Sequence, residues 1–273
     1  MLVLHHGDFD GVCAASIIKT INNSCKCVEY NYNQEFPMSI INNNETVFLV
    51  DLTLSQELME ELNNRSQLIW IDHHLAINDI DIKPFRKYCK IGTAACKLVY
   101  QYFYKNKFNQ VVEYINNYDI WNHEDPNTIY FHYGILLEND LSPNNTKLWK
   151  KLLSDNFDCS EYINNGKIIY KYIKNTNKEK IKNNAFLTKF CGYKTICIND
   201  NMANSKIFDS CIGKYDYELM IIFKLMKNKK WIISLYTEKD YINCAEIAKK
   251  FQGGGHKAAA GFCSNTLPKE LLN

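Results

Sequence analysis

Carboxylate and imidazole side chains gather in three short clusters within the first third of the chain. They are His-Gly-Asp-Phe-Asp at residues 6–10, Asp51, and Asp-His-His at residues 72–74. In the first cluster, two carboxylates that are two residues apart can point the same way from an extended strand end, with an imidazole beside them. Mixed carboxylate and imidazole ligands suit Mn²⁺, whereas Ca²⁺ prefers oxygen ligands alone and structural Zn²⁺ often takes thiolates. The clusters therefore predict a metal site.

Each cluster also has a purely structural explanation. Asp10 can cap the helix that begins beside it, and Asp51 can cap the helix expected from Leu54. A single buried histidine is more often a core residue than a ligand. However, five of the seven histidines lie at residues 5, 6, 73, 74 and 256, the positions of these clusters and of a glycine-rich run near the end of the chain. Because coincidence explains this concentration poorly, we favour the functional interpretation.

Two features further along the chain extend the pattern. Asp119 supplies a carboxylate from a helical region, although an ordinary helix-end acid looks the same and Glu124 and Asp125 are close competitors. The run at residues 253–256 has three consecutive glycines, whose backbone N–H groups can converge on an anion, and a histidine as a further donor. The alanines at residues 258–260 permit close helix packing, and a helix C-cap followed by a flexible turn is the alternative.

Short apolar runs alternate with helical patterns in the first half of the chain, which is typical of a parallel sheet flanked by helices. Three of the expected strands end at one of the clusters. Ligands of open parallel sheets bind outside the carboxyl ends of the strands, so we expect the clusters to meet in space. The expected strands are Leu2–Leu4, Val28–Tyr32, Val47–Val50 and Leu68–Ile71, with helices at Val12–Ile21 and Leu54–Leu62.

The second half predicts a helical region and then a smaller α/β domain. With 273 residues, two compact domains are more plausible than one. We expect an α/β metal-binding domain over residues 1–150, a helical linker over 151–185, and a smaller α/β domain over 186–273 across a cleft. Helical patterns occupy Thr93 to about Lys150, Tyr162–Asn184 and Cys244–Phe251, and strand patterns occupy Thr195–Ile198, Leu219–Phe223 and Trp231–Tyr236.

Composition limits the partners of the chain. The 32 basic and 30 acidic residues leave a net charge of +2, far from the basic excess that long duplex nucleic acid requires. The 11 scattered cysteines indicate free thiols in a reducing compartment. Nothing in the sequence is typical of a signal peptide or a membrane span. We therefore expect a cytoplasmic protein that acts on short anionic substrates, without a membrane partner, and we leave a homodimer open.

The chain resembles the DHH phosphoesterase superfamily with its C-terminal DHHA1 domain. The resemblance rests on the clusters at residues 6–10, 51 and 72–74, on Asp119 and on the terminal Gly-Gly-Gly-His, and it covers essentially the whole chain. Within the superfamily the chain is most similar to the oligoribonuclease and cyclic-nucleotide phosphodiesterase branch, which includes nanoRNases. It is less similar to RecJ exonucleases, which carry further domains. The resemblance implies a hydrolase that uses two divalent cations, Mn²⁺ with Mg²⁺ as the alternative.

The resemblance also implies a role for each residue of the clusters. One cation would be held by His6, Asp8 and Asp51, and the other by Asp10, Asp51, His73 and Asp119. The spacing of the first motif favours His6 over His5 as the ligand. The implied catalytic residues are Asp72, His73 and His74, and the implied substrate-binding residues are His74, Gly253, Gly254, Gly255 and His256.

The resemblance leaves several substrates open. Hydrolysis of phosphodiester bonds in short oligonucleotides is the first expectation, and cyclic mono- or dinucleotides and pAp are alternatives. Pyrophosphate or polyphosphate hydrolysis and a catalytically silent nucleotide-binding module are others. Many relatives with this C-terminal domain carry an arginine in a Ser-Leu-Arg-Ser segment, whereas this chain reads Ser234-Leu-Tyr236-Thr237. One phosphate contact is thus lost or replaced, which leaves the length of the substrate open.

Overall fold

The computed structural model describes residues 1–32, 34–105, 107–202, 204–211 and 213–271. It contains two compact units, Met1–Tyr170 and Lys171–Asn273, and the boundary between them falls within the long helix α7 (Ser160–Asn184). In the described part of the chain, no helix has the length and hydropathy of a membrane span.

The first unit is built on a parallel five-stranded sheet with the strand order β2-β1-β3-β4-β5. The strands are β1 (Leu2–His6), β2 (Lys26–Tyr30), β3 (Glu45–Val50), β4 (Ser66–Ile71) and β5 (Arg86–Lys87). From β1 the chain passes to β2 on one side, and then crosses to β3 on the other side of β1. This change of direction makes the carboxyl ends of β1 and β3 the topological switch point, where sheets of this kind bind ligands.

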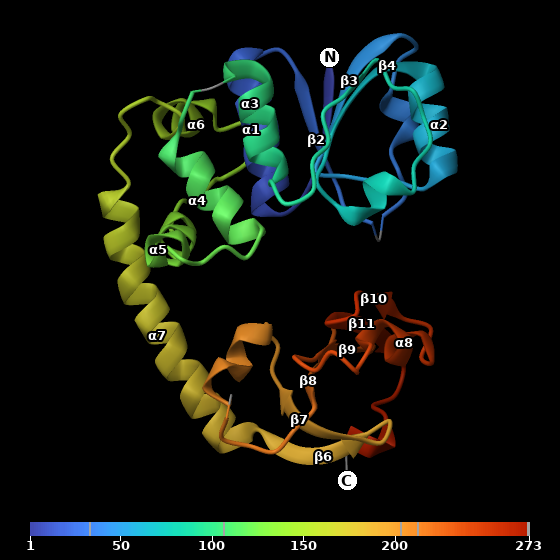
Figure 1. The fold of residues 1–273 in the computed structure, drawn as a ribbon, viewed down its shortest axis with the longest axis vertical. Coiled ribbons are helices and arrows are strands. Elements are labelled where there is room, and N and C mark those ends of the chain that lie inside the picture. Colours follow the sequence, from blue (N-terminus) through green and yellow to red (C-terminus); the bar gives the residue numbers. More distant parts are fainter. Residues whose placement is uncertain (33, 106, 203, 212, 272–273) are drawn as a thin grey trace. The chain divides into compact units, whose positions relative to one another are not determined.

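Helices cover both faces of this sheet (Figure 1). Alternate strand residues enter two separate cores: Val3 and Ile69 belong to one, and Leu4 and Trp70 to the other. This alternation on two buried faces explains why the strands read as continuous apolar runs. The second core includes residues of α2 (Gln56–Arg65), and the first includes residues of α1 (Phe9–Ile21), α3 (Ala95–Tyr104), α4 (Gln110–Asp119), α5 (Pro126–Ile135) and α6 (Thr146–Leu152).

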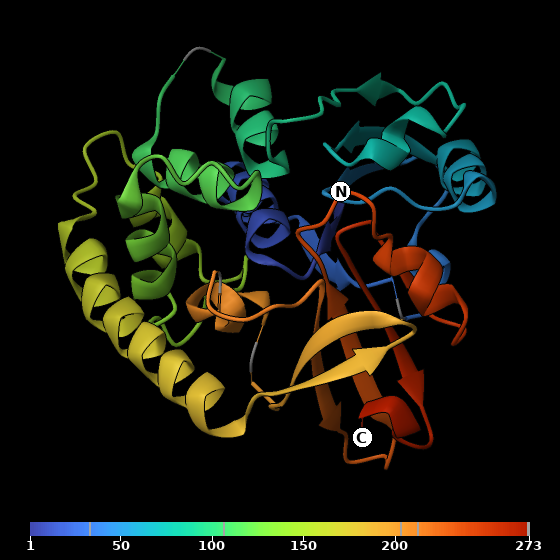
Figure 2. The same ribbon diagram turned by 60° about the horizontal axis from the view of Figure 1, so that its bottom comes forward.

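The second unit contains a mixed six-stranded sheet with the order β10-β11-β9-β8-β7-β6, coloured from golden yellow to red in Figure 2. Only β7 and β8 pair in parallel among its described strands. The helix α8 (Cys244–Lys249) packs beside β11. The strands are β6 (Phe186–Phe190), β7 (Tyr193–Asn199), β8 (Leu219–Leu225), β9 (Trp231–Tyr236), β10 (Gly254–Gly255) and β11 (Ala259–Ser264).

The predicted α/β architecture of both parts is confirmed, with local corrections. Strand β2 begins at Lys26 and ends at Tyr30, so the expectation that it reaches Tyr32 is wrong. The alanines at 258–260 do not lie in a packed helix, because Ala259 begins β11 and pairs with Tyr236 of β9. The pairing of β11 with its neighbours in the sheet outweighs the helix propensity of alanine here.

Candidate metal centre

The three sequence clusters meet at the carboxyl ends of β1, β3 and β4. The Nδ1 atom of His6 lies 2.8 Å from Asp8 Oδ2 and 3.6 Å from Asp51 Oδ2. The other oxygen of Asp51, Oδ1, lies 3.3 Å from His73 Nε2. Asp51 therefore stands between the first cluster and the third, with one carboxylate oxygen toward each.

A second group forms around His73 with side chains from two helices. His73 Nε2 lies 3.6 Å from Asp10 Oδ2 in α1 and 3.3 Å from Asp119 Oδ2 at the end of α4. The potential ligand atoms of His6, Asp8 and Asp51 lie within 4.8 Å of one another, and so do those of Asp10, His73 and Asp119. The structure thus brings together all six residues that the family resemblance implies as metal ligands, and it forms two adjacent groups.

The environment of Asp51 fits a bound cation. Asp51 is only 1% exposed, and its backbone adopts a φ of 58°, in the left-handed region. Within the described part of the chain, both Asp51 oxygens, His6 Nδ1 and Asp119 Oδ2 are buried without a hydrogen-bond partner. A buried carboxylate without partners is strongly unfavourable. Divalent cations satisfy oxygen and imidazole donors of this kind, so the donor set fits such ions.

Asp8 and Asp10 have different structural roles, although both lie at the start of α1. Asp8 is the N-cap of α1, where its Oδ1 accepts a hydrogen bond of 3.0 Å from the Gly11 amide. Asp10 is 2% exposed and accepts hydrogen bonds from the amides of Ala95 (2.7 Å) and Cys96 (2.8 Å). The alternative that Asp10 caps its own helix is therefore wrong, because it caps α3 from a distant part of the chain.

Gly11 allows α1 to start directly against β1. A Cβ atom at this position would lie 2.4 Å from the carbonyl oxygen of His6. Any larger residue would push the beginning of α1 away from the strand end. The glycine thus keeps Asp8 and Asp10 close to His6.

Comparisons with known proteins agree with this geometry. The model of the DHH family, N-terminal domain, matches residues 1–120, which include all six potential ligands. The oligoribonuclease NrnB of Bacillus subtilis is 25% identical over 296 residues, covering 96% of this chain and 72% of that protein. Residues 1–120 form a DHH family N-terminal domain.

Two further similarities extend the comparison. An uncharacterized protein of Acanthamoeba polyphaga mimivirus is 26% identical over 242 residues, covering 85% of this chain. The chain spans only 56% of the length of that relative. A pGpG-specific phosphodiesterase from Vibrio cholerae has the same fold, with a TM-score of 0.58 at 14% identity over 96% of this chain and 92% of that one.

In this DHH domain, the triplet Asp72-His73-His74 is organised by its aspartate. Asp72 is fully buried, and its Oδ1 accepts hydrogen bonds of 2.7 Å from the His73 amide and from His74 Nδ1. Its Oδ2 accepts a hydrogen bond from the Thr53 hydroxyl. Asp72 therefore fixes the turn of the DHH motif and the orientation of the His74 ring, whose Nε2 is left for other contacts.

The charges of the DHH centre perturb one another strongly. The neighbouring carboxylates of Asp51 and Asp8 raise the pKa of His6 to about 10. The hydrogen bond with Asp72 raises the pKa of His74 to about 9. Burial, together with the charge of Asp51, raises the pKa of Asp119 to about 6. These shifts indicate that the carboxylates of the centre outnumber its positive groups. Cations would neutralise this excess of buried negative charge.

Two residues around the DHH centre were not predicted from the sequence. Thr53 is buried and holds Asp72, while the Tyr32 hydroxyl accepts a hydrogen bond of 3.3 Å from the Thr53 amide. The Tyr32 ring also lies 5.8 Å from the His6 ring, centroid to centroid. Thr53 follows Asp51 by two residues, and this short spacing is the signal that could have identified it.

The glycine-rich run belongs to the second unit and forms a tight hairpin. Gly254 and Gly255 pair with Gly261 and Ala260, and the His256 amide donates a hydrogen bond of 2.7 Å to the Ala259 carbonyl. Gly255 has a φ of 139°, and a Cβ atom there would lie 2.5 Å from Ala260. His256 is exposed at the tip of this hairpin. Its implied phosphate contact stays a prediction.

Proposed function

We propose that this protein is a metal-dependent phosphoesterase that hydrolyses the phosphodiester bonds of short oligonucleotides. The observation that carries the proposal is Asp51, a buried carboxylate whose two unpartnered oxygens face two separate groups of ligands. Such a residue is suited to bridge two cations. Manganese as the preferred cation, a cytoplasmic location and a homodimer stay predictions from the sequence.

In the proposed mechanism, His6, Asp8 and Asp51 would hold one cation, and Asp10, Asp51, His73 and Asp119 would hold the other. Two cations in such a site lower the pKa of water and neutralise charge on phosphoryl oxygens. Asp72 keeps His74 oriented through its Nδ1 atom. Because the same hydrogen bond raises the pKa of His74 to about 9, the imidazole is a cation at neutral pH and can donate from Nε2 to a phosphoryl oxygen.

The proposal for short oligonucleotides is supported by relatives and by charge. NrnB is named an oligoribonuclease. The net charge of +2 is far from the basic excess that is typical of proteins that bind long duplex nucleic acid. The Asp-His-His triplet and the ligand groups do not themselves distinguish one phosphoester from another, so the substrate requires a direct assay.

The decisive experiment is a panel of substrates supplied with Mn²⁺. The panel contains di- to pentanucleotide RNAs, cyclic dinucleotides, cyclic AMP, pAp and pyrophosphate. We expect metal-dependent hydrolysis of the linear dinucleotides and no turnover by a variant with Asp72→Ala and His73→Ala. His73→Ala alone keeps the hydrogen bonds of Asp72 with Thr53 and His74, and serves where the double variant folds poorly. Exposed Asp79→Ala is the matched control. Unchanged turnover by a folded His73→Ala protein would contradict the proposal.

We further propose that His256 donates a hydrogen bond to a phosphate of the substrate. Hydrogen bonds to charged groups contribute about 1.5–3 kcal/mol, so His256→Ala should lower kcat/KM for dinucleotides by roughly 10- to 100-fold. Metal binding in the first unit should not change, which a thermal-shift titration with Mn²⁺ measures. Exposed Lys257→Ala is the neighbouring control. Equal losses in both variants would reject a specific role for the histidine.

A further inference from the structure

A pocket of about 460 Å³ lies beside the candidate metal centre, within the first unit. Gly7, Asp8 and Phe9 line it where β1 passes into α1, and Cys27 and Glu29 line it from β2. The segment between α5 and α6 forms another wall, and His5 and Val12 complete the lining. Pockets that bind small molecules have volumes of about 300–1,000 Å³, so this one is large enough for a nucleobase and its sugar.

The pocket begins at the metal centre itself, because Asp8 belongs to both. The side chain of Asp8 lies 2.8 Å from His6 through Oδ2 and also forms part of the pocket lining. A phosphate held beside Asp8 would therefore place the nucleoside attached to it at the entrance of the pocket.

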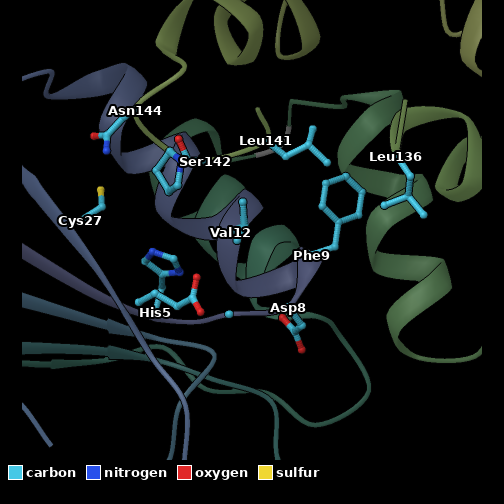
Figure 3. Close-up of a pocket in the computed structure, with 12 residues that line it drawn as sticks. His5, Asp8, Phe9, Val12, Cys27, Leu136, Leu141, Ser142 and Asn144 are labelled. Atoms are coloured by element: carbon cyan, nitrogen blue, oxygen red, sulfur yellow. The ribbon is translucent and has the colours of Figure 1, made fainter. Parts of the chain in front are cut away.

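The walls combine apolar surface with carboxylates. Figure 3 shows Phe9, Leu136 and Leu141 gathered on one side, with His5 and Cys27 on the other. Among the described lining residues there are two carboxylates, Asp8 and Glu29, and no lysine or arginine. This lining disfavours a second phosphate. It favours a flat, neutral group that stacks on apolar walls and donates hydrogen bonds.

Glu29 is the one carboxylate among the described lining residues that does not belong to the candidate metal centre. Its Oε1 accepts a hydrogen bond of 2.9 Å from Asn31 Nδ2. A Cβ atom at Gly7 would lie 2.5 Å from the same Oε1, so the glycine lets the carboxylate approach the end of β1. Glu29 is exposed, and a carboxylate has about four acceptor positions. It therefore retains capacity for a ligand's N–H groups.

We propose that this pocket binds a guanine base of the substrate, with Glu29 as its acceptor, an inference that rests on the proposed function. A carboxylate accepts two parallel hydrogen bonds from a group with two adjacent N–H donors. Guanine offers such a pair at N1 and N2, whereas adenine and cytosine present an amino group beside an acceptor and uracil presents a single imino N–H between two carbonyls. The ring of Phe9 supplies apolar surface for the base.

The test compares Glu29→Gln with the wild type on three 5′-phosphorylated dinucleotides, of guanosine, adenosine and uridine, and on bis(p-nitrophenyl) phosphate, a diester without a base. Gln keeps the Oε1 acceptor for Asn31 but replaces the other oxygen with a donor. A bidentate contact to a base contributes about 1–3 kcal/mol, so KM for the guanosine dinucleotide should rise by roughly 5- to 150-fold. The uridine dinucleotide and the base-free diester should change less than about twofold. Glu61→Gln, an exposed carboxylate of α2, is the matched control.

The outcomes separate this proposal from the proposed function. Loss of guanosine preference with unchanged hydrolysis of the base-free diester supports the pocket assignment. Equal KM values of the variant and the wild type for the guanosine dinucleotide overturn it, and so does an equal rise for all three dinucleotides. If the wild type hydrolyses neither the dinucleotides nor the base-free diester with Mn²⁺ present, the proposed function fails instead. Inhibition by GMP, measured in parallel, should weaken in Glu29→Gln and not in Glu61→Gln.

Discussion

Asp51→Asn should abolish metal-dependent hydrolysis while the metal-free protein stays folded. Asn has nearly the same shape and adopts a φ of 58° as readily as Asp does. It removes a buried charge that has no hydrogen-bond partner in the described structure and that raises the pKa of Asp10 and Asp119. Cations stabilise transition-state charge by several kcal/mol, so kcat should fall by roughly 1,000-fold or more.

Thermal unfolding gives the same prediction a readout that is independent of activity. A ligand that binds only the folded state at 100 times its Kd stabilises the protein by about 2.7 kcal/mol. Saturating Mn²⁺ should therefore raise the Tm of the wild type and of the exposed control Asp79→Asn, and EDTA should reverse the shift. Asp51→Asn should show a much smaller rise. A normal rise in Tm, or residual turnover within tenfold of the wild type, would remove Asp51 from the bridging position.

The gathering of the clusters could be predicted from the sequence because topology determines it. Strand ends of a parallel sheet share one edge, so residues that directly follow β1, β3 and β4 had to lie near one another. Asp51 and His73 were predictable in this way. Asp119 was harder, because its place depends on how α4 packs rather than on the order of the strands.

Other features depended on packing that no local pattern records. The amides of Ala95 and Cys96 reach Asp10 across 85 and 86 residues of sequence. Nothing near Asp10 indicates that contact. The pocket beside Asp8 likewise needs the loop between α5 and α6 to close over β1 and β2. Strands β5 and β10 have two residues each, and two residues carry no periodicity that a sequence pattern could reveal. These strands form because neighbouring strands pair with them.

Asp10→Ala should destabilise the metal-free protein more than Asp8→Ala does, although both should lose activity. Asp10→Ala leaves the buried amides of Ala95 and Cys96 without an acceptor, and each such loss costs about 1–3 kcal/mol. Ala94, the N-cap position of α3, has no side chain that can replace it. Asp8 makes one cap contact, with Gly11, and lies near solvent, where replacing a cap residue with alanine costs about 1 kcal/mol.

Urea unfolding in EDTA measures this difference without the contribution of cations. Burial raises the pKa of Asp10, and repulsion from Asp51 and Asp119 raises it further. Removing the Asp10 carboxylate relieves these unfavourable effects, which offsets part of the loss. We therefore expect the free energy of unfolding to fall by about 2 kcal/mol or more in Asp10→Ala, and by clearly less in Asp8→Ala. Equal unfolding free energies of the two variants would mean that the repulsion outweighs the hydrogen bonds. In that case the role of Asp10 would be cation binding alone, and its hydrogen bonds would not stabilise the N-terminus of α3.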